Sequence, residues 1–185
     1  EDDLFDIRTL GFCGEALPSV GSVAVLSIAS RPPSKRDGFE IIVERGEKSG
    51  LKPAAINAGT RVEVQELFSA TPARLKFLKS ERAENMAVSE MVKRLAMAHP
   101  DVGFSVTTGE RTGLRLPRCE ASAEGLLQRL GRIMGREFMA DALAISGERD
   151  GVRILGYAGL PTLHRPDAGQ QFLFVHLIDV GAVDQ

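Results

Sequence analysis

The sequence predicts an α+β fold in two parts, and three observations support this prediction. Strand-like stretches, either alternating or continuously apolar, occur in both halves of the chain. Residues 81–98 instead repeat apolar side chains at intervals of three and four, as an amphipathic helix does. A proline and a potential capping serine within residues 117–122 separate the two parts. We therefore expect one domain over residues 1–119 and the start of another over residues 120–185.

Three strands are expected early in the first part. Residues 23–29 form a continuous apolar run that is typical of a buried strand, and turn-forming residues follow it. Residues 39–45 and 60–67 also carry strand signals. Because Val62 and Val64 alternate with charged residues, these two strands are expected to be antiparallel neighbours with one face in water.

Helical signals follow these strands. Pro72 fits the first turn of a helix, and residues 73–78 are good helix formers. The longer helix over residues 81–98 is expected to end before Pro100, because a residue that precedes proline leaves the helical region. The apolar stripe of this helix is expected to be buried and comprises Val88, Met91, Val92, Leu95 and Ala98.

A hairpin is expected to close the first part, with strands at residues 102–107 and 112–116. Ser122 is placed to cap the next helix. The buried face of that helix is expected to comprise Leu126, Leu127, Leu130, Ile133 and Met134. Three further strands are expected at residues 142–146, 152–158 and 172–175.

Composition and charge exclude several classes of protein. The 185 residues are 43% hydrophobic and 26% charged, which is typical of a globular chain. No apolar run approaches the roughly 18 residues of a membrane span, and the chain starts with acidic residues, unlike a signal peptide. We therefore expect a protein without membrane association that is not secreted and is cytoplasmic. Two distant cysteines predict neither a disulfide nor a zinc site, and the net charge of −2 does not itself indicate nucleic-acid binding.

The sharpest local motif lies at residues 9–17, where Gly11 and Gly14 bracket two residues and precede a helix-compatible segment. Glycine lets a backbone approach an anion closely, and a helix start offers unpaired N–H groups at its positive dipole end. Such a turn is suited to cradle phosphate oxygens. The spacing alone, however, favours an ordinary helix-entry turn in which glycine only permits the bend.

The motif Gly11-Phe-Cys-Gly-Glu-Ala-Leu17 resembles the Gly-Phe-Arg-Gly-Glu-Ala-Leu element of MutL-type DNA mismatch-repair proteins. These proteins belong to the GHKL ATPase superfamily, which they share with gyrase and histidine kinases. Residues 59–64, 67–68 and 71–78 resemble the next signature of the family, in the same order. The resemblance continues to residue 175 and so covers nearly the whole chain. Two departures are Cys13 in place of arginine and residues 176–179 in place of Asn-Gly-Arg.

The resemblance implies the second half of a GHKL-type ATPase sandwich, a sheet with helices on one face, followed by the start of a ribosomal-protein-type βα transducer domain. Thr60 would face the nucleotide pocket from its strand, although Thr60 taken alone is better explained as a β-branched core residue. The nucleotide phosphates would be lined, mainly through backbone amides, by Gly11, Phe12, Cys13, Gly14, Glu15 and Ala16. Because backbone contacts tolerate side-chain changes, Cys13 need not abolish this cradle.

The resemblance also implies what the intact protein does. It would bind ATP with Mg²⁺, hydrolyse ATP slowly, and couple mismatch recognition to downstream repair factors. Its partners would be DNA, a MutS-type mismatch-recognition protein and a second copy of itself. The general base, the metal ligand and the adenine-recognising aspartate are expected upstream of this chain, which lacks an initiator methionine and should not hydrolyse ATP by itself.

Two further patterns have a plain interpretation. Glu81 and Asn85 match the spacing of the family's Glu-x-x-x-Asn motif, but they follow the Gly-rich turn instead of preceding it, so we expect a solvent-facing helix turn. Arg74, Lys76 and Lys79 belong to a basic cluster that nearby glutamates balance. A solvated surface is favoured for this cluster, and the alternative is a weak, sequence-independent DNA contact.

Two other functions remain open from the sequence. One is a non-enzymatic nucleic-acid-binding or interaction module, because the second part reads as a small βα unit. The other is a different GHKL ATPase, such as a type II topoisomerase subunit, against which residues 71–78 argue.

Overall fold

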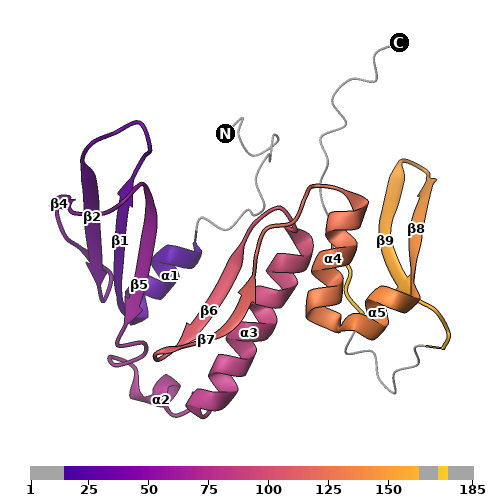
Figure 1. The fold of residues 1–185 in the computed structure, drawn as a ribbon. Helices are drawn as coiled ribbons and strands as arrows, with labels where there is room; N and C mark the ends of the chain where they lie inside the picture. Colours follow the sequence, from indigo (N-terminus) through magenta and orange to yellow (C-terminus); the bar gives the residue numbers. More distant parts are fainter. Residues whose placement is uncertain (1–14, 163–170, 175–185) are drawn as a thin grey trace. The chain divides into compact units, whose positions relative to one another are not determined.

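The computed structural model of the protein describes residues 15–162 and 171–174 (Figure 1). Helices and antiparallel strands both occur, so the predicted α+β class is confirmed. The described residues fall into two compact units, which divide between Leu78 and Lys79. This division follows backbone contacts, and the domain boundary at residues 119/120 stays a prediction.

The first unit is built on one antiparallel sheet. Its strands are β1 (Val25–Arg31), β2 (Gly38–Glu44), β3 (Glu47–Lys48), β4 (Lys52–Ala54) and β5 (Gly59–Gln65). Strand β1 lies between β2 and β5 and is antiparallel to both, while β3 and β4 pair with β2. The prediction that the second and third early strands are direct neighbours was therefore wrong, because β1 separates them.

Helix α1 (Ala16–Val23) packs on one face of this sheet. Leu26 of β1 pairs with Val43 of β2 and Val64 of β5, so the three side chains share a face. Gly21 lies against this row: a Cβ atom there would come within 2.9 Å of Val43 Cγ1. Leu26 is 2% exposed, which confirms β1 as a buried strand. The strand starts two residues later than expected because Val23 still belongs to the helix.

The second unit contains both long helices of the described chain. Its elements are α3 (Glu81–Ala98), β6 (Phe104–Thr108), β7 (Arg111–Leu116), α4 (Ala123–Met134), α5 (Arg136–Asp141), β8 (Ala142–Arg149) and β9 (Val152–Gly159). Helix α3 has the predicted bounds, since the Ser80 side chain accepts from the Ala83 amide and the helix ends at His99. Ser122 caps α4 as expected, by accepting from the amide of Gly125.

The buried faces of these two helices differ from the predicted ones. On α3, Val88, Met91 and Leu95 are 50%, 60% and 46% exposed, while Ala96 and Met97 are buried. The reason is that β6 and α4 contact a side of α3 that is not centred on the predicted stripe. None of the five apolar residues expected in the core of α4 is fully buried. The buried positions of α4 are Gly125, Arg129 and Gly131.

The last predicted strand is not formed within the described residues. Residues 171–174 are irregular, and the ring of Phe172 lies 5.6 Å from the guanidinium carbon of Arg94. A contact with α3 therefore takes the place of strand pairing there. Residues 176–179, whose sequence departs from the family pattern, lie outside the described residues. Within the described ranges, no helix is both long and apolar enough to cross a bilayer.

A close approach of the backbone at Gly38 gives a test of the first unit. A Cβ atom there would lie 2.6 Å from Ile56 Cγ2 and 2.8 Å from the carbonyl oxygen of Ala54. We expect Gly38→Ala to lower the free energy of unfolding by about 1–3 kcal/mol, because β2 and the chain around Ile56 must move apart. Urea unfolding measures this change.

Gly50→Ala is the matched control, because its Cβ atom would meet nothing within 4 Å. It should leave stability within about 0.5 kcal/mol of the wild type. Equal effects of the two substitutions would contradict the packing described at Gly38.

Candidate functional site

The described part of the predicted phosphate loop is the start of helix α1. Glu15 is the N-cap and Ala16 the first helical residue, whereas residues 11–14 (Gly11, Phe12, Cys13 and Gly14) lie outside the described residues. The first amides of an α-helix have no partner within the helix. No side chain caps this helix and its first turn contains no acidic residue. The electropositive end of α1 therefore remains suited to an anion.

Thr60 lies near the start of β5, opposite Ser30 of β1. Its Oγ1 atom is 2.8 Å from Ser30 Oγ, and the side chain is exposed. The alternative of a buried core residue is therefore wrong. Side chains alternate along a strand, so Ser30 and Thr60 share the face of Leu26, on which α1 packs. The described residues of the predicted site thus belong to one unit and to one side of its sheet, and their role in binding stays a prediction.

The loop after β5 is fixed to α1 by its backbone. Glu66 and Phe68 have φ angles of 53° and 64°, in the left-handed region that costs most residues roughly 1–2 kcal/mol. The Phe68 amide donates to the carbonyl oxygen of Val23, the last residue of α1, at 2.8 Å. The Thr71 amide in turn donates to the Phe68 carbonyl at 2.9 Å. These bonds hold the unusual loop conformation between the strand of Thr60 and the next helix.

That next helix, α2 (Pro72–Leu75), opens the basic segment, which we define as residues 74–79. Arg74 and Lys76 are exposed, and none of the ion pairs among the described residues includes either of them. Phe77 is 85% exposed between these cations and Lys79. Phe77 also lies between basic residues in the sequence, a signal that the interpretation as a solvated surface did not include. An exposed ring among cations is a typical feature of a nucleic-acid-binding surface.

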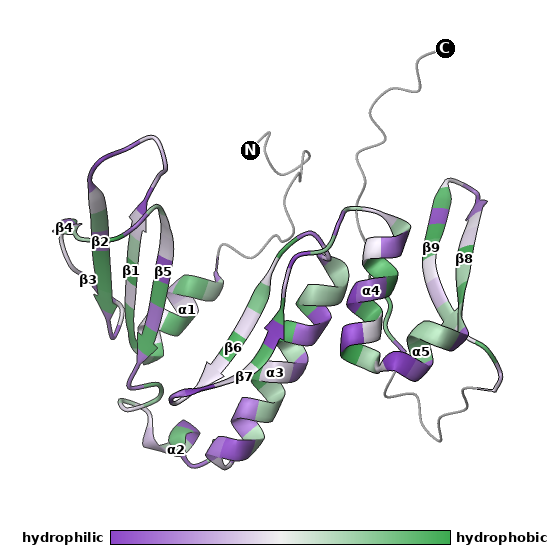
Figure 2. Cartoon of the chain, viewed as in Figure 1, coloured by the Kyte–Doolittle hydropathy of each residue, from purple (hydrophilic) through white to green (hydrophobic). Residues whose placement is uncertain are grey.

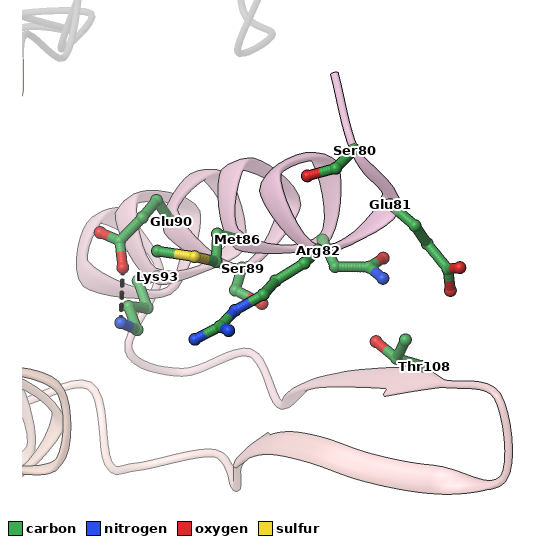
Figure 3. A pocket seen from close by; sticks show the side chains of 9 residues that line it. Ser80, Glu81, Arg82, Met86, Ser89, Glu90, Lys93 and Thr108 are labelled. Carbon is green, nitrogen blue, oxygen red and sulfur yellow. Dashed lines mark hydrogen bonds and ion pairs between the residues drawn. The ribbon is translucent and has the colours of Figure 1, made fainter. Parts of the chain in front are cut away.

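Glu81 and Asn85 line an open groove between α3 and the end of β6 (Figure 3). The other lining residues are Ser80, Arg82, Met86, Ser89, Glu90, Lys93 and Thr108. Figure 2 shows the first turns of α3 as largely hydrophilic, and Glu81 is exposed, as expected. Asn85 is half-buried. Among the described residues no three His, Cys, Asp or Glu side chains are grouped to hold a metal.

Comparison with known proteins identifies the class to which this fold belongs. The chain is similar to the solved Aquifex aeolicus MutL ATPase domain complexed with ADP, with a TM-score of 0.62 and 30% identity, over 79% of this chain and 55% of that one. The N-terminal domain of a DNA repair protein matches with a TM-score of 0.62 over 82% of this chain and 49% of that one; at 22% identity it shows the fold alone. The fold is that of a DNA-repair ATPase domain.

Proteins with a similar sequence point to one kind of DNA-repair protein. The chain is 53% identical over 174 residues to the DNA mismatch repair protein MutL of Chelativorans sp. (strain BNC1), and 50% identical over 175 residues to that of Brucella abortus (strain S19). No protein-family model matches it. The matches cover 94% and 95% of this chain, which spans 28% of the length of each relative. The resemblance to MutL-type mismatch-repair proteins found in the motifs of this chain is therefore confirmed.

The groove on α3 leads to a prediction for the intact protein. A general base typically contributes roughly a hundredfold or more to a rate. Since Glu81 is exposed on the first turn of α3, we expect Glu81→Gln and Asn85→Ala each to change any ATP turnover of the intact protein by less than about twofold. A loss of two orders of magnitude would show that this pair is the catalytic one.

Proposed function

We propose that the protein containing this chain is a DNA mismatch-repair ATPase. It binds ATP with Mg²⁺, hydrolyses ATP slowly, and uses the resulting conformational change to couple mismatch recognition to downstream repair factors. The observation that carries the proposal is the identity of 53% to a mismatch-repair protein over 94% of this chain. The proposal is further supported by the start of α1, which has no side-chain cap bond, and by Thr60 of β5, because both lie on one side of the same sheet.

The nucleotide phosphates are assigned to residues 11–16, with Thr60 at the pocket wall. The described part of this segment is the start of α1, where helix amides can bind phosphate and the N-cap residue Glu15 makes no side-chain cap bond to them. The ADP held by the Aquifex aeolicus relative is consistent with this assignment. Mg²⁺ would neutralise charge on the triphosphate when bound.

A charge placed at the start of α1 tests the phosphate site. Ala16→Asp should leave the fold intact, because an acidic residue in a first turn interacts favourably with the helix dipole. The same carboxylate should repel the triphosphate and weaken ATP binding at least about tenfold. Titration of the full-length protein with a fluorescent ATP analogue measures the affinity.

Ser22→Asp supplies the control, since it puts the same charge on the same helix near its other end, at an exposed position. Its ATP affinity should stay near that of the wild type. If Ala16→Asp binds ATP as tightly as Ser22→Asp does, the phosphates lie elsewhere.

We further propose that Arg74, Lys76 and Lys79 contact DNA through its phosphate backbone. Arg74 and Lys76 are exposed without an acidic partner among the described residues, so a phosphate replaces only water around them. Phe77 adds an exposed ring on which a base can stack. Binding of this kind does not depend on sequence and weakens steeply with salt.

The salt dependence of DNA affinity tests this contact. Each lost phosphate contact lowers the slope of log K against log salt by about 0.7–0.9, so Arg74→Gln with Lys76→Gln should lower it by about 1.4–1.8. Fluorescence anisotropy with a labelled oligonucleotide at several salt concentrations gives the slope. Lys35→Gln with Arg36→Gln, at two exposed cations of the β1–β2 loop, is the control and should leave the slope unchanged.

The resemblance to MutL-type proteins also motivates the proposed partners. We assign to the intact protein a homodimeric state, an interaction with a MutS-type mismatch-recognition protein, and a cytoplasmic location. If the purified protein bound DNA in a salt-sensitive way but never bound nucleotide, the non-enzymatic interaction module would become the better description.

A further inference from the structure

Arg129 of α4 is fully buried, at 0% exposure, and is surrounded by backbone carbonyl groups. Its Nη2 atom lies 2.7 Å from the carbonyl oxygen of Val102, 2.8 Å from that of Pro100 and 2.9 Å from that of Pro117. Its Nη1 atom donates to the Leu116 carbonyl at 3.4 Å. One side chain therefore joins α4 to the turn after α3 and to the end of β7.

Within the described part of the chain, this guanidinium has no acidic partner. None of the ion pairs among the described residues includes Arg129, and its Nε atom has no hydrogen-bond partner. The Phe104 ring lies 5.9 Å from the guanidinium carbon and adds a cation–π contact. A buried cation is costly unless hydrogen bonds compensate it, and here the carbonyl groups do so. If α4 moved away from the turn after α3 or from the end of β7, the buried charge would lose hydrogen bonds. The contact therefore strongly favours the observed packing of these segments.

The connection between β7 and α4, residues 117–122, is held in two other ways. The Cys119 amide donates to the Pro100 carbonyl at 2.8 Å, and the Cys119 side chain is buried. At Gly125 the backbone approaches so closely that a Cβ atom would lie 2.0 Å from the carbonyl oxygen of Glu120. Residues 117–122 are therefore packed against the turn after α3 and against the start of α4, unlike a flexible linker.

We propose that Arg129 is a positioning residue that makes the 117–122 connection rigid, so that α4 moves as one body with α3 and the β6–β7 hairpin. Rotation at residues 117–122 would break the carbonyl cluster around the guanidinium. In the intact protein, movement that reaches α3 or the β6–β7 hairpin when nucleotide binds is then passed to the chain beyond residue 120 and is not absorbed at the connection. This second step rests on the proposed ATPase function.

The planar guanidinium is essential to this role. Arginine presents donors in a fixed fork and so reaches acceptors on several segments at once, whereas lysine carries one compact ammonium. Arg129→Lys keeps the charge and should lose part of the carbonyl cluster. Arg132, which is exposed on the same helix, provides the matched control as Arg132→Lys.

The experiment compares these two variants in the full-length protein. Hydrogen exchange at the Cys119 amide should accelerate about tenfold in Arg129→Lys and remain unchanged in Arg132→Lys. ATP affinity should stay within about threefold of the wild type in both. Protection from proteolysis beyond residue 120, induced by a non-hydrolysable ATP analogue, should be lost in Arg129→Lys alone. Its ATP turnover should fall about tenfold, within the usual range of coupling between sites.

The proposal is overturned if exchange at Cys119 is unchanged in Arg129→Lys, or if exchange rises while the analogue still protects the chain beyond residue 120. It is also overturned if Arg129→Lys fails to fold by circular dichroism, since Arg129 would then be a general requirement for folding. Failure of the ATPase proposal is distinct, because the wild type itself would then bind no ATP. Exchange at Cys119 would still decide whether Arg129 makes the connection rigid.

Discussion

The pairing of β1 with both β2 and β5 is the interaction on which the first unit depends. It places Leu26, Val43 and Val64 in one row, and α1 packs against this row. The same pairing sets Thr60 opposite Ser30, on the side of the sheet that carries α1. The start of α1 and Thr60 belong to separate sequence motifs. It is β1, as the central strand, that holds both on the same side of the sheet.

The second unit is held together differently at its centre. Its buried centre includes a guanidinium among carbonyl groups, in addition to small apolar residues such as Ala96. Apolar packing tolerates small shifts because it has little directional preference, whereas hydrogen bonds to a buried cation weaken steeply when their geometry changes. The two units therefore differ in kind: the first supplies a frame for the proposed binding site, and the second joins several segments by directional bonds.

Local signals in the sequence were sufficient for much of this fold. Ser80 and the His99-Pro100 pair define the ends of α3, and both act on neighbouring backbone groups. The order of the strands was not predictable in this way, because β1 pairs with residues far along the chain in both directions. The stripe through Met91 has the period of a helix but is largely exposed, because periodicity does not specify which element covers a helix face. Arg129 escaped notice because its acceptors are backbone carbonyls, which no side-chain pattern reveals.

The candidate site shows the same limit of side-chain patterns. Amides at a helix start recognise phosphate whatever side chains they carry, so the Gly-rich motif alone is weak and an unusual residue such as Cys13 is compatible with it. Specificity came from the linkage of this motif with the Gly59-Thr60 element. The structure gives that linkage a physical basis, because α1 packs on the face of β1 that Thr60 shares through its pairing with Ser30. Side chains give little indication of a site that is built from backbone groups. Such a site is identified more reliably from the strand pairing that brings its parts together.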